Sequence, residues 1–250
     1  MTERPSPPDH LTKAISLIRA GKSREALPIL DDLIEGDPGS FHALRERGLA
    51  KKFTNDLPGA LADFSEVIRR WPDNPVGFTS RADARRLAED WDGAIDDYSS
   101  AIAIDPNHKF AYLQRGRLKV RTGNMHGAIA DFTQDTKHSK TRLSGLLNRG
   151  TTKHLIGDLE GALDDLSEAI RLEGVRPVFA PLFRGRVKLT AGDFPGAIVD
   201  FTAAIEAFPR LTNALRLRAE ARGFAGDASG ANEDRQRYEE LGGEDLPAFT

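Results

Sequence analysis

Apolar and polar positions along the chain repeat with a period of about 34 residues. Larger apolar side chains follow a recurring alanine at the fourth position in most copies, and a small or apolar one usually follows at the seventh. Because offsets of zero, four and seven lie on one face of an α-helix, the pattern predicts a helix around each of these anchor alanines. They recur at intervals of 34, 34, 34, 34, 35 and 34 residues, as Ala26, Ala60, Ala94, Ala128, Ala162, Ala197 and Ala231.

A turn signal precedes each predicted helix. Glycine stands five positions before most anchor alanines, and Asp or Asn stands four before in six copies. Glycine ends a helix in the left-handed conformation, and Asp or Asn caps the helix that follows. A proline twelve positions after four of the anchors ends the second helix. Each unit is therefore predicted to be a helix, a tight turn, a second helix and a loop.

This unit resembles the tetratricopeptide repeat. The stretch from Trp91 to Ala101 and the later Pro106 carry the turn, the anchor alanine, the aromatic residue, the second alanine and the proline of that family. The resemblance implies an all-α fold, a right-handed superhelical solenoid of antiparallel helix pairs. It divides the chain into a disordered lead-in at 1–8, one solenoid over 9–242 and a tail at 243–250. The seven repeats are expected at about 9–40, 41–74, 75–108, 109–142, 143–177, 178–211 and 212–242.

Charged residues recur with the repeat. From the second copy on, an arginine stands thirteen positions before the anchor and an aspartate stands three after it, whereas the first copy has Lys13 and Ile29. Joint presence and joint absence predict an ion pair between the two helices, since a half-buried arginine without a partner would be costly. The alternative is an arginine row that binds phosphates. A second basic residue, nine before the anchor, forms either a strip for an acidic partner or solvated surface.

Composition and motifs give no catalytic or cofactor site. The 35 basic and 38 acidic residues leave a formal charge of −3, which makes nucleic acid an unlikely partner. The absence of cysteine excludes disulfides and thiolate metal sites. The histidines have no metal-binding spacing, and neighbouring carboxylates such as Asp96 and Asp97 diverge on a helix. We expect no enzyme activity, no cofactor, no metal and no membrane segment, and a cytoplasmic location.

Function is sought in the positions that vary between copies. In the related family the first helices line the concave face, and the corresponding positions lie 18, 15, 11 and 8 residues before each anchor. Exposed apolar groups rimmed by arginine often mark protein interfaces, although Phe110 and Phe179 could instead pack between repeats. We predict a scaffold or adaptor that binds a somewhat acidic peptide with apolar side chains. The candidate groove residues are Arg45, Lys52, Arg86, Phe110, Arg117, Arg121, His154, Phe179, Phe183 and Arg186.

Other surfaces offer weaker candidates. The carboxylate clamp with which some family members bind chaperones is not apparent, because Asn148 has no counterpart at Gln114 or Phe183. The apolar first helix of copy one could instead support self-association in a structural component. Asp135 in place of a small residue, followed by the polar stretch 136–142, indicates a hinge or a partner-facing notch. One extra residue near 174–177 predicts a local change in the stacking of the repeats.

Overall fold

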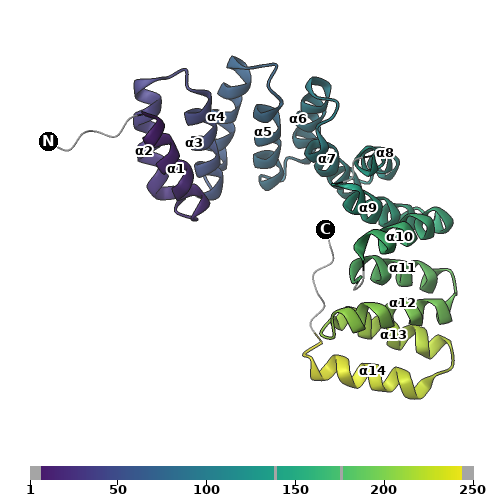
Figure 1. The fold of residues 1–250 in the computed structure, drawn as a ribbon. Helices are drawn as coiled ribbons and strands as arrows, with labels where there is room; N and C mark the ends of the chain where they lie inside the picture. The colour runs from purple at the N-terminus through teal and green to yellow at the C-terminus, as the bar shows by residue number, and fades with distance from the viewer. Residues whose placement is uncertain (1–6, 138–139, 175–176, 244–250) are drawn as a thin grey trace. The chain divides into compact units, whose positions relative to one another are not determined.

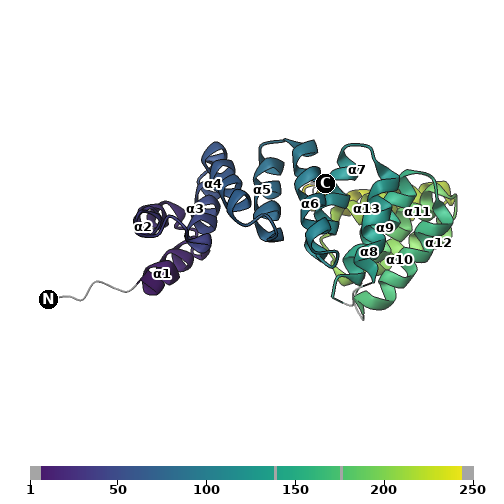
Figure 2. The ribbon, with the colours of Figure 1, turned by 90° about the horizontal axis from the view of Figure 1, so that it is seen from above.

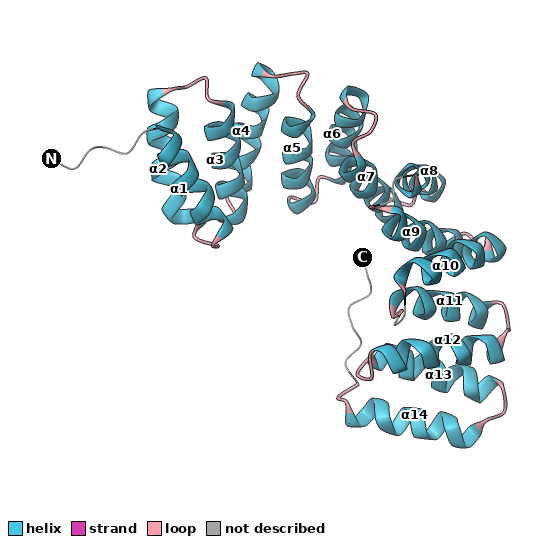
Figure 3. Cartoon of the chain, in the orientation of Figure 1, coloured by secondary structure: helices cyan, strands magenta, loops and turns pink. Residues whose placement is uncertain are grey.

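The computed structural model describes residues 7–137, 140–174 and 177–243. All regular structure in these ranges is helical, as the colouring of Figure 3 shows. The fourteen helices of the described ranges are α1 (Pro7–Arg19), α2 (Ser23–Gly36), α3 (Phe41–Phe53), α4 (Leu57–Arg70), α5 (Pro75–Leu87), α6 (Trp91–Ile104), α7 (Lys109–Arg121), α8 (Met125–Thr136), α9 (Arg142–Leu155), α10 (Leu159–Glu173), α11 (Phe179–Thr190), α12 (Phe194–Ala207), α13 (Thr212–Phe224) and α14 (Ala228–Glu240) (Figure 1). The predicted all-α architecture of paired helices is confirmed.

The helices form two compact units, Met1–Arg115 and Gly116–Thr250, and the boundary lies within α7. Within each unit, an odd-numbered first helix packs against the even-numbered second helix that follows, and that second helix packs against the next first helix. First helices also pack against one another, α1 with α3 and α3 with α5 in the first unit, and α9 with α11 and α11 with α13 in the second. No two second helices in the described ranges pack to a similar extent. Within each unit, first and second helices therefore form separate layers, and the order of the helices can be followed in Figures 1 and 2.

The predicted capping residues begin six of the seven second helices. Each side chain accepts a hydrogen bond of 2.9–3.0 Å from the backbone N–H of the glycine three residues later. The bond satisfies one of the N–H groups that a helix leaves unpaired in its first turn. The first copy has Lys22 at this place, and α2 has no side-chain cap. The six caps are Asp56, Asp90, Asn124, Asp158, Asp193 and Asp227.

The residue before each cap has a left-handed backbone whether or not it is glycine. Five copies have glycine there, at φ between 76° and 85°. Asn55 and Glu89 occupy the same place in the second and third copies and have φ values of 66° and 60°. The turn therefore imposes this conformation, which costs a residue with a Cβ about 1–2 kcal/mol.

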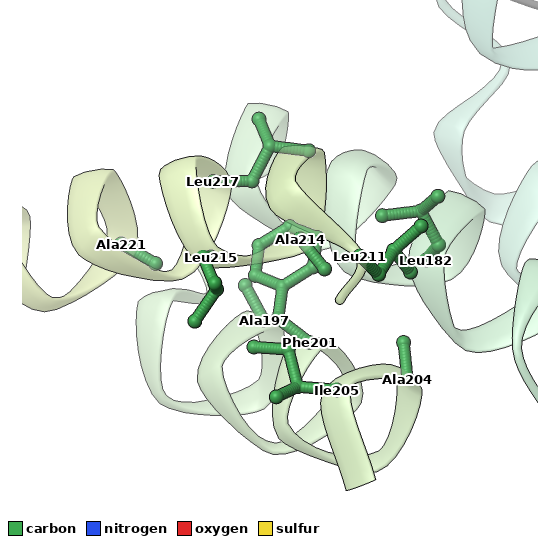
Figure 4. Close-up of a cluster of buried hydrophobic side chains, with 10 residues drawn as sticks. All are labelled: Leu182, Ala197, Phe201, Ala204, Ile205, Leu211, Ala214, Leu215, Leu217 and Ala221. Atoms are coloured by element: carbon green, nitrogen blue, oxygen red, sulfur yellow. The ribbon is translucent and has the colours of Figure 1, made fainter. Parts of the chain in front are cut away.

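The core within each pair forms where the first helix has a small residue, glycine in four copies and alanine in three. The anchor alanines are essentially inaccessible to solvent. Phe201 of α12 projects toward the first helices and packs among Leu211, Ala214 and Leu215 (Figure 4). A Cβ added to Gly185 of α11 would lie 2.6 Å from Cε1 of that ring. The glycine twelve positions before the anchor is thus required by the close approach of the phenylalanine.

Two irregular junctions fall where the repeat pattern breaks. Asp135 of α8 is only 1% exposed, its backbone carbonyl accepts a hydrogen bond from Thr141, and its carboxylate accepts one of 3.3 Å from Ser144. At the other junction, Glu173 at the end of α10 accepts hydrogen bonds of 2.9 Å from three successive backbone N–H groups at 178–180. Glu173 therefore caps α11, a function that the sequence pattern did not indicate. Residues 138–139 and 175–176 lie outside the described ranges.

The chain ends differ slightly from expectation. Helix α1 begins at Pro7, two residues before the predicted first repeat, so the end of the predicted lead-in is helical. Residues 1–6 and 244–250 are outside the described ranges. Among the residues described, no helix combines the length and apolar character needed to cross a bilayer.

Candidate functional site

The recurring arginines and aspartates form ion pairs inside the repeats. In five copies the arginine thirteen residues before the anchor donates from Nε and Nη2 to both oxygens of the aspartate three residues after it, at 2.6–2.9 Å. The aspartates are at most 5% exposed. The predicted ion pair is confirmed, and these arginines have their planar donors directed at carboxylates rather than at a phosphate ligand. The pairs are Arg47–Asp63, Arg81–Asp97, Arg149–Asp165, Arg184–Asp200 and Arg218–Asp234.

The third donor nitrogen of each arginine connects neighbouring repeats. Nη1 donates to an oxygen on the preceding second helix, five residues after that helix's anchor, at 2.9–3.3 Å. The sequence pattern did not indicate this contact, although the acceptor position holds an oxygen-bearing side chain in every one of these copies. The bonds are Arg47–Asp31, Arg81–Ser65, Arg115–Ser99, Arg149–Thr133, Arg184–Ser167 and Arg218–Thr202.

The second recurring cation binds the same aspartate. Its nitrogen lies 2.9–3.0 Å from the carboxylate in all six copies that have it. In four copies it also donates to the carbonyl of the glycine before the anchor. These cations are therefore held against their own repeats, which argues against a basic strip for an acidic partner. They are Lys51, Arg85, Lys119, Lys153, Lys188 and Arg222.

In the first unit, three of the predicted groove residues lie close together on α3 and α5. Arg45, Lys52 and Arg86 are all half-buried, and Arg45 donates to the carboxylate of its neighbour Glu46. Burial lowers the pKa of Lys52, the positive charges of Arg86 and Arg45 lower it further, and Asp83 opposes them. Helices α3 and α5 pack against one another, and the charges of both arginines act on Lys52.

An aromatic pair adjoins these cations. The Tyr98 hydroxyl of α6 donates to Oδ1 of Asp83 at 2.6 Å. Burial and the charge of Asp83 raise the pKa of Tyr98, whereas Arg86 acts in the opposite direction. The Phe110 ring, 45% exposed, meets the Tyr98 ring edge to face at a centroid distance of 6.3 Å. The sequence pattern assigned Tyr98 to the core alone and did not indicate its hydroxyl contact.

In the second unit, predicted groove residues meet on α9 and α11. His154 Nε2 lies 2.9 Å from the Thr190 hydroxyl, and burial followed by the charge of Arg186 lowers the pKa of His154. Phe179 is 38% exposed, Phe183 is half-buried and Arg186 is exposed.

Arg117 and Arg121, the two predicted groove residues on α7 in this unit, are exposed. The ten predicted residues are thus divided between the units, and their joint use by one ligand stays a prediction. The described residues contain no cluster of His, Asp and Glu arranged to hold a metal ion.

Comparison with known proteins identifies the repeat. The family model described as "Tetratricopeptide repeat" matches residues 11–75 and 47–109. The family model covers residues 11–109 of this chain, and the helix pairs beyond them continue the same fold. No curated protein matches its sequence.

Solved structures of tetratricopeptide-repeat proteins share the fold over 72–94% of this chain. A tetratricopeptide repeat protein from Parabacteroides merdae is 18% identical, with a TM-score of 0.69 over 94% of this chain and 93% of that one. The C-terminal part of a repeat-containing protein from Cytophaga hutchinsonii is 16% identical, with a TM-score of 0.76 over 92% and 95%. YrrB, described as a tetratricopeptide-repeat protein with an unusual peptide-binding site, is 17% identical, with a TM-score of 0.59 over 72% and 93%.

Proposed function

We propose that this tetratricopeptide-repeat protein is a non-enzymatic scaffold or adaptor that binds a segment of a partner protein on its first-helix face. The observation that carries the proposal is the contrast between recurring and variable residues. The recurring cations are bound to buried aspartates inside the repeats, whereas the variable positions of the first helices keep aromatic rings and cations in contact with solvent. Exposed aromatic and arginine side chains are typical of protein-binding surfaces.

The printed description of YrrB adds support from the same fold, because it attributes a peptide-binding site to that protein. Self-association through the N-terminal helix has less support. Leu11, Ile15 and Ile18 of α1 are only partly exposed, and the largest exposed apolar side chains in the described ranges lie on other helices.

Site-specific photo-crosslinking tests the proposal. A photo-reactive phenylalanine analogue replaces Phe110 or Phe179 on the first-helix face, and in a matched control it replaces Val199, a 66% exposed apolar residue on second helix α12. Partner crosslinks should form at the first two positions and not at the third. Crosslinks that form equally well at Val199 would contradict the proposed surface.

A further inference from the structure

The group formed by Arg45, Lys52 and Arg86 is here named the α3–α5 cation cluster. Its members make local contacts, Arg45 with Glu46, Lys52 with the Phe53 ring and Arg86 with the Tyr98 hydroxyl. None of the three belongs to the recurring arginine–aspartate pairs. The Nε–H groups of Arg45 and Arg86 are both buried, and neither has a hydrogen-bond acceptor among the described residues. A buried donor without an acceptor costs about 1–3 kcal/mol, so the cluster reduces the stability of the fold.

Electrostatic repulsion within the cluster also reduces the stability of the fold. Lys52 is desolvated and lies in the field of two guanidinium groups, with Asp83 as the opposing charge. Local arrangements that weaken a fold are expected at functional sites. The charges of the cluster therefore call for an anion that is not part of the described chain.

The net charge of the cluster sets the number of anionic groups that it can bind. Two carboxylates oppose the three cations: Glu46 accepts from Arg45, and Asp83 acts on Lys52 and accepts from the Tyr98 hydroxyl. When these two carboxylates are subtracted from the three cations, one positive charge remains, and it matches a single further carboxylate. The exposed Phe110 ring, reached from Asp83 through Tyr98, lies beside this site and can contact an apolar side chain next to that carboxylate.

The position of the cluster favours binding of a side-chain carboxylate within the partner segment over binding of the partner's C-terminal carboxylate. Helix α3 packs against α1 on one side and α5 on the other, so the first-helix face continues past the cluster. We propose that the α3–α5 cation cluster binds an aspartate or glutamate side chain within a partner segment, and that an adjacent aromatic or aliphatic side chain packs on Phe110. This inference rests on the proposed function and specifies the partner chemistry.

Nuclear magnetic resonance of the whole chain, labelled with ¹⁵N-arginine, tests the proposal through the Nε–H signals of Arg45 and Arg86. The probes are twelve-residue Gly/Ser peptides with blocked ends and a central Glu-Phe, Gln-Phe or Glu-Ser pair. A fourth probe carries Gln-Phe and a free C-terminal carboxylate. Glu-Phe should shift both signals saturably, Glu-Ser should bind several-fold more weakly, and the two Gln-Phe probes should not bind. Equal binding of Gln-Phe and Glu-Phe, or shifts only with the free C-terminus, would overturn the proposal.

Variants separate a binding role from a structural one. Arg86→Gln should weaken Glu-Phe binding about tenfold, because it removes a charge-assisted hydrogen bond. Arg69→Gln is the matched control, since Arg69 is exposed on second helix α4 and Glu66 keeps Arg70 as a partner. Lys52→Met should weaken binding and raise the melting temperature, a combination that a purely stabilising lysine would not produce.

Two results separate this inference from the proposed function. If partner crosslinks form at Phe110 and Phe179 but the Glu-Phe probe shifts neither signal, the carboxylate site is wrong and the first-helix surface stands. If crosslinks favour Val199, the proposed function itself fails.

Discussion

At the scale of single residues, each buried aspartate holds two cations of different importance. Arg149 binds both oxygens of Asp165 and also reaches Thr133 on the preceding repeat, whereas Lys153 contacts one oxygen. The hydrogen bond to Asp165 raises the pKa of Arg149 despite its burial. The arginine therefore connects three helices, whereas the lysine adds a second cation to a carboxylate that the arginine already neutralises.

Removal of the aspartate should consequently be far more harmful than removal of the lysine. Asp165→Ala leaves two partly buried cations without their carboxylate and should destabilise the fold by about 3–5 kcal/mol. Lys153→Met keeps the bidentate pair and should cost about 1 kcal/mol or less. Urea unfolding at pH 7 measures both values, and similar losses for the two variants would refute this ranking.

At the scale of elements, the turn between the two helices of a repeat requires a left-handed residue at one position, whichever amino acid stands there. The sequence predicted this turn from glycines and capping residues, and the caps are confirmed. The third copy has no glycine at this place, and the positive φ of Glu89 was not predicted. The Arg Nη1 contacts were not predicted, because they join neighbouring repeats and depend on how the repeats stack.

Substitutions at this one turn position should have opposite effects in different copies. Glu89→Gly removes the strain of a left-handed residue with a Cβ and should stabilise the protein by about 1 kcal/mol. Gly157→Ala, at φ 82° in the fifth copy, should destabilise it by about the same amount. Thermal unfolding of the two variants and the unaltered chain decides the matter, and a loss of stability in Glu89→Gly would be incompatible with strain at this turn.

Contacts between first helices should make stability depend on pH. His154 joins α9 to α11 through Thr190, and its pKa is lowered by burial and Arg186. Between this lowered value and the ordinary value of 6.5, the unfolded chain binds more protons than the folded one, so stability falls as the pH falls. The melting temperature should drop more from pH 7 to pH 5 in the unaltered chain than in His154→Gln. Equal drops would show that His154 does not contribute.

At the scale of the whole molecule, the sequence predicted the helical array well, whereas the binding surface stays a prediction. Every copy must fold and stack, so the structural residues recur and can be recognised. Variable positions carry no such signal. Thr79 and Leu182, both at predicted surface positions, are 8% and 6% exposed, and Leu182 packs into the cluster around Phe201. Burial of this kind depends on the neighbouring repeat, which the repeat pattern of a single copy does not specify.

The central claim is that variable cations of the first helices, and not surface charge in general, bind the partner. The decisive measurement is the dissociation constant of a synthetic peptide corresponding to the partner segment crosslinked at Phe110 or Phe179. It compares the unaltered chain with a variant in which Arg86, Arg117, Arg121 and Arg186 are changed to glutamate. A control variant has the same four-fold change at exposed second-helix arginines, Arg24, Arg171, Arg235 and Arg237.

With helicity and melting temperature verified for each protein, the account predicts that binding is lost in the first variant, because like charges would then face the acidic segment. The control should bind within about twofold of the unaltered chain. Equal affinity of the first variant and the unaltered chain, or equal weakening in the two variants, would contradict the claim.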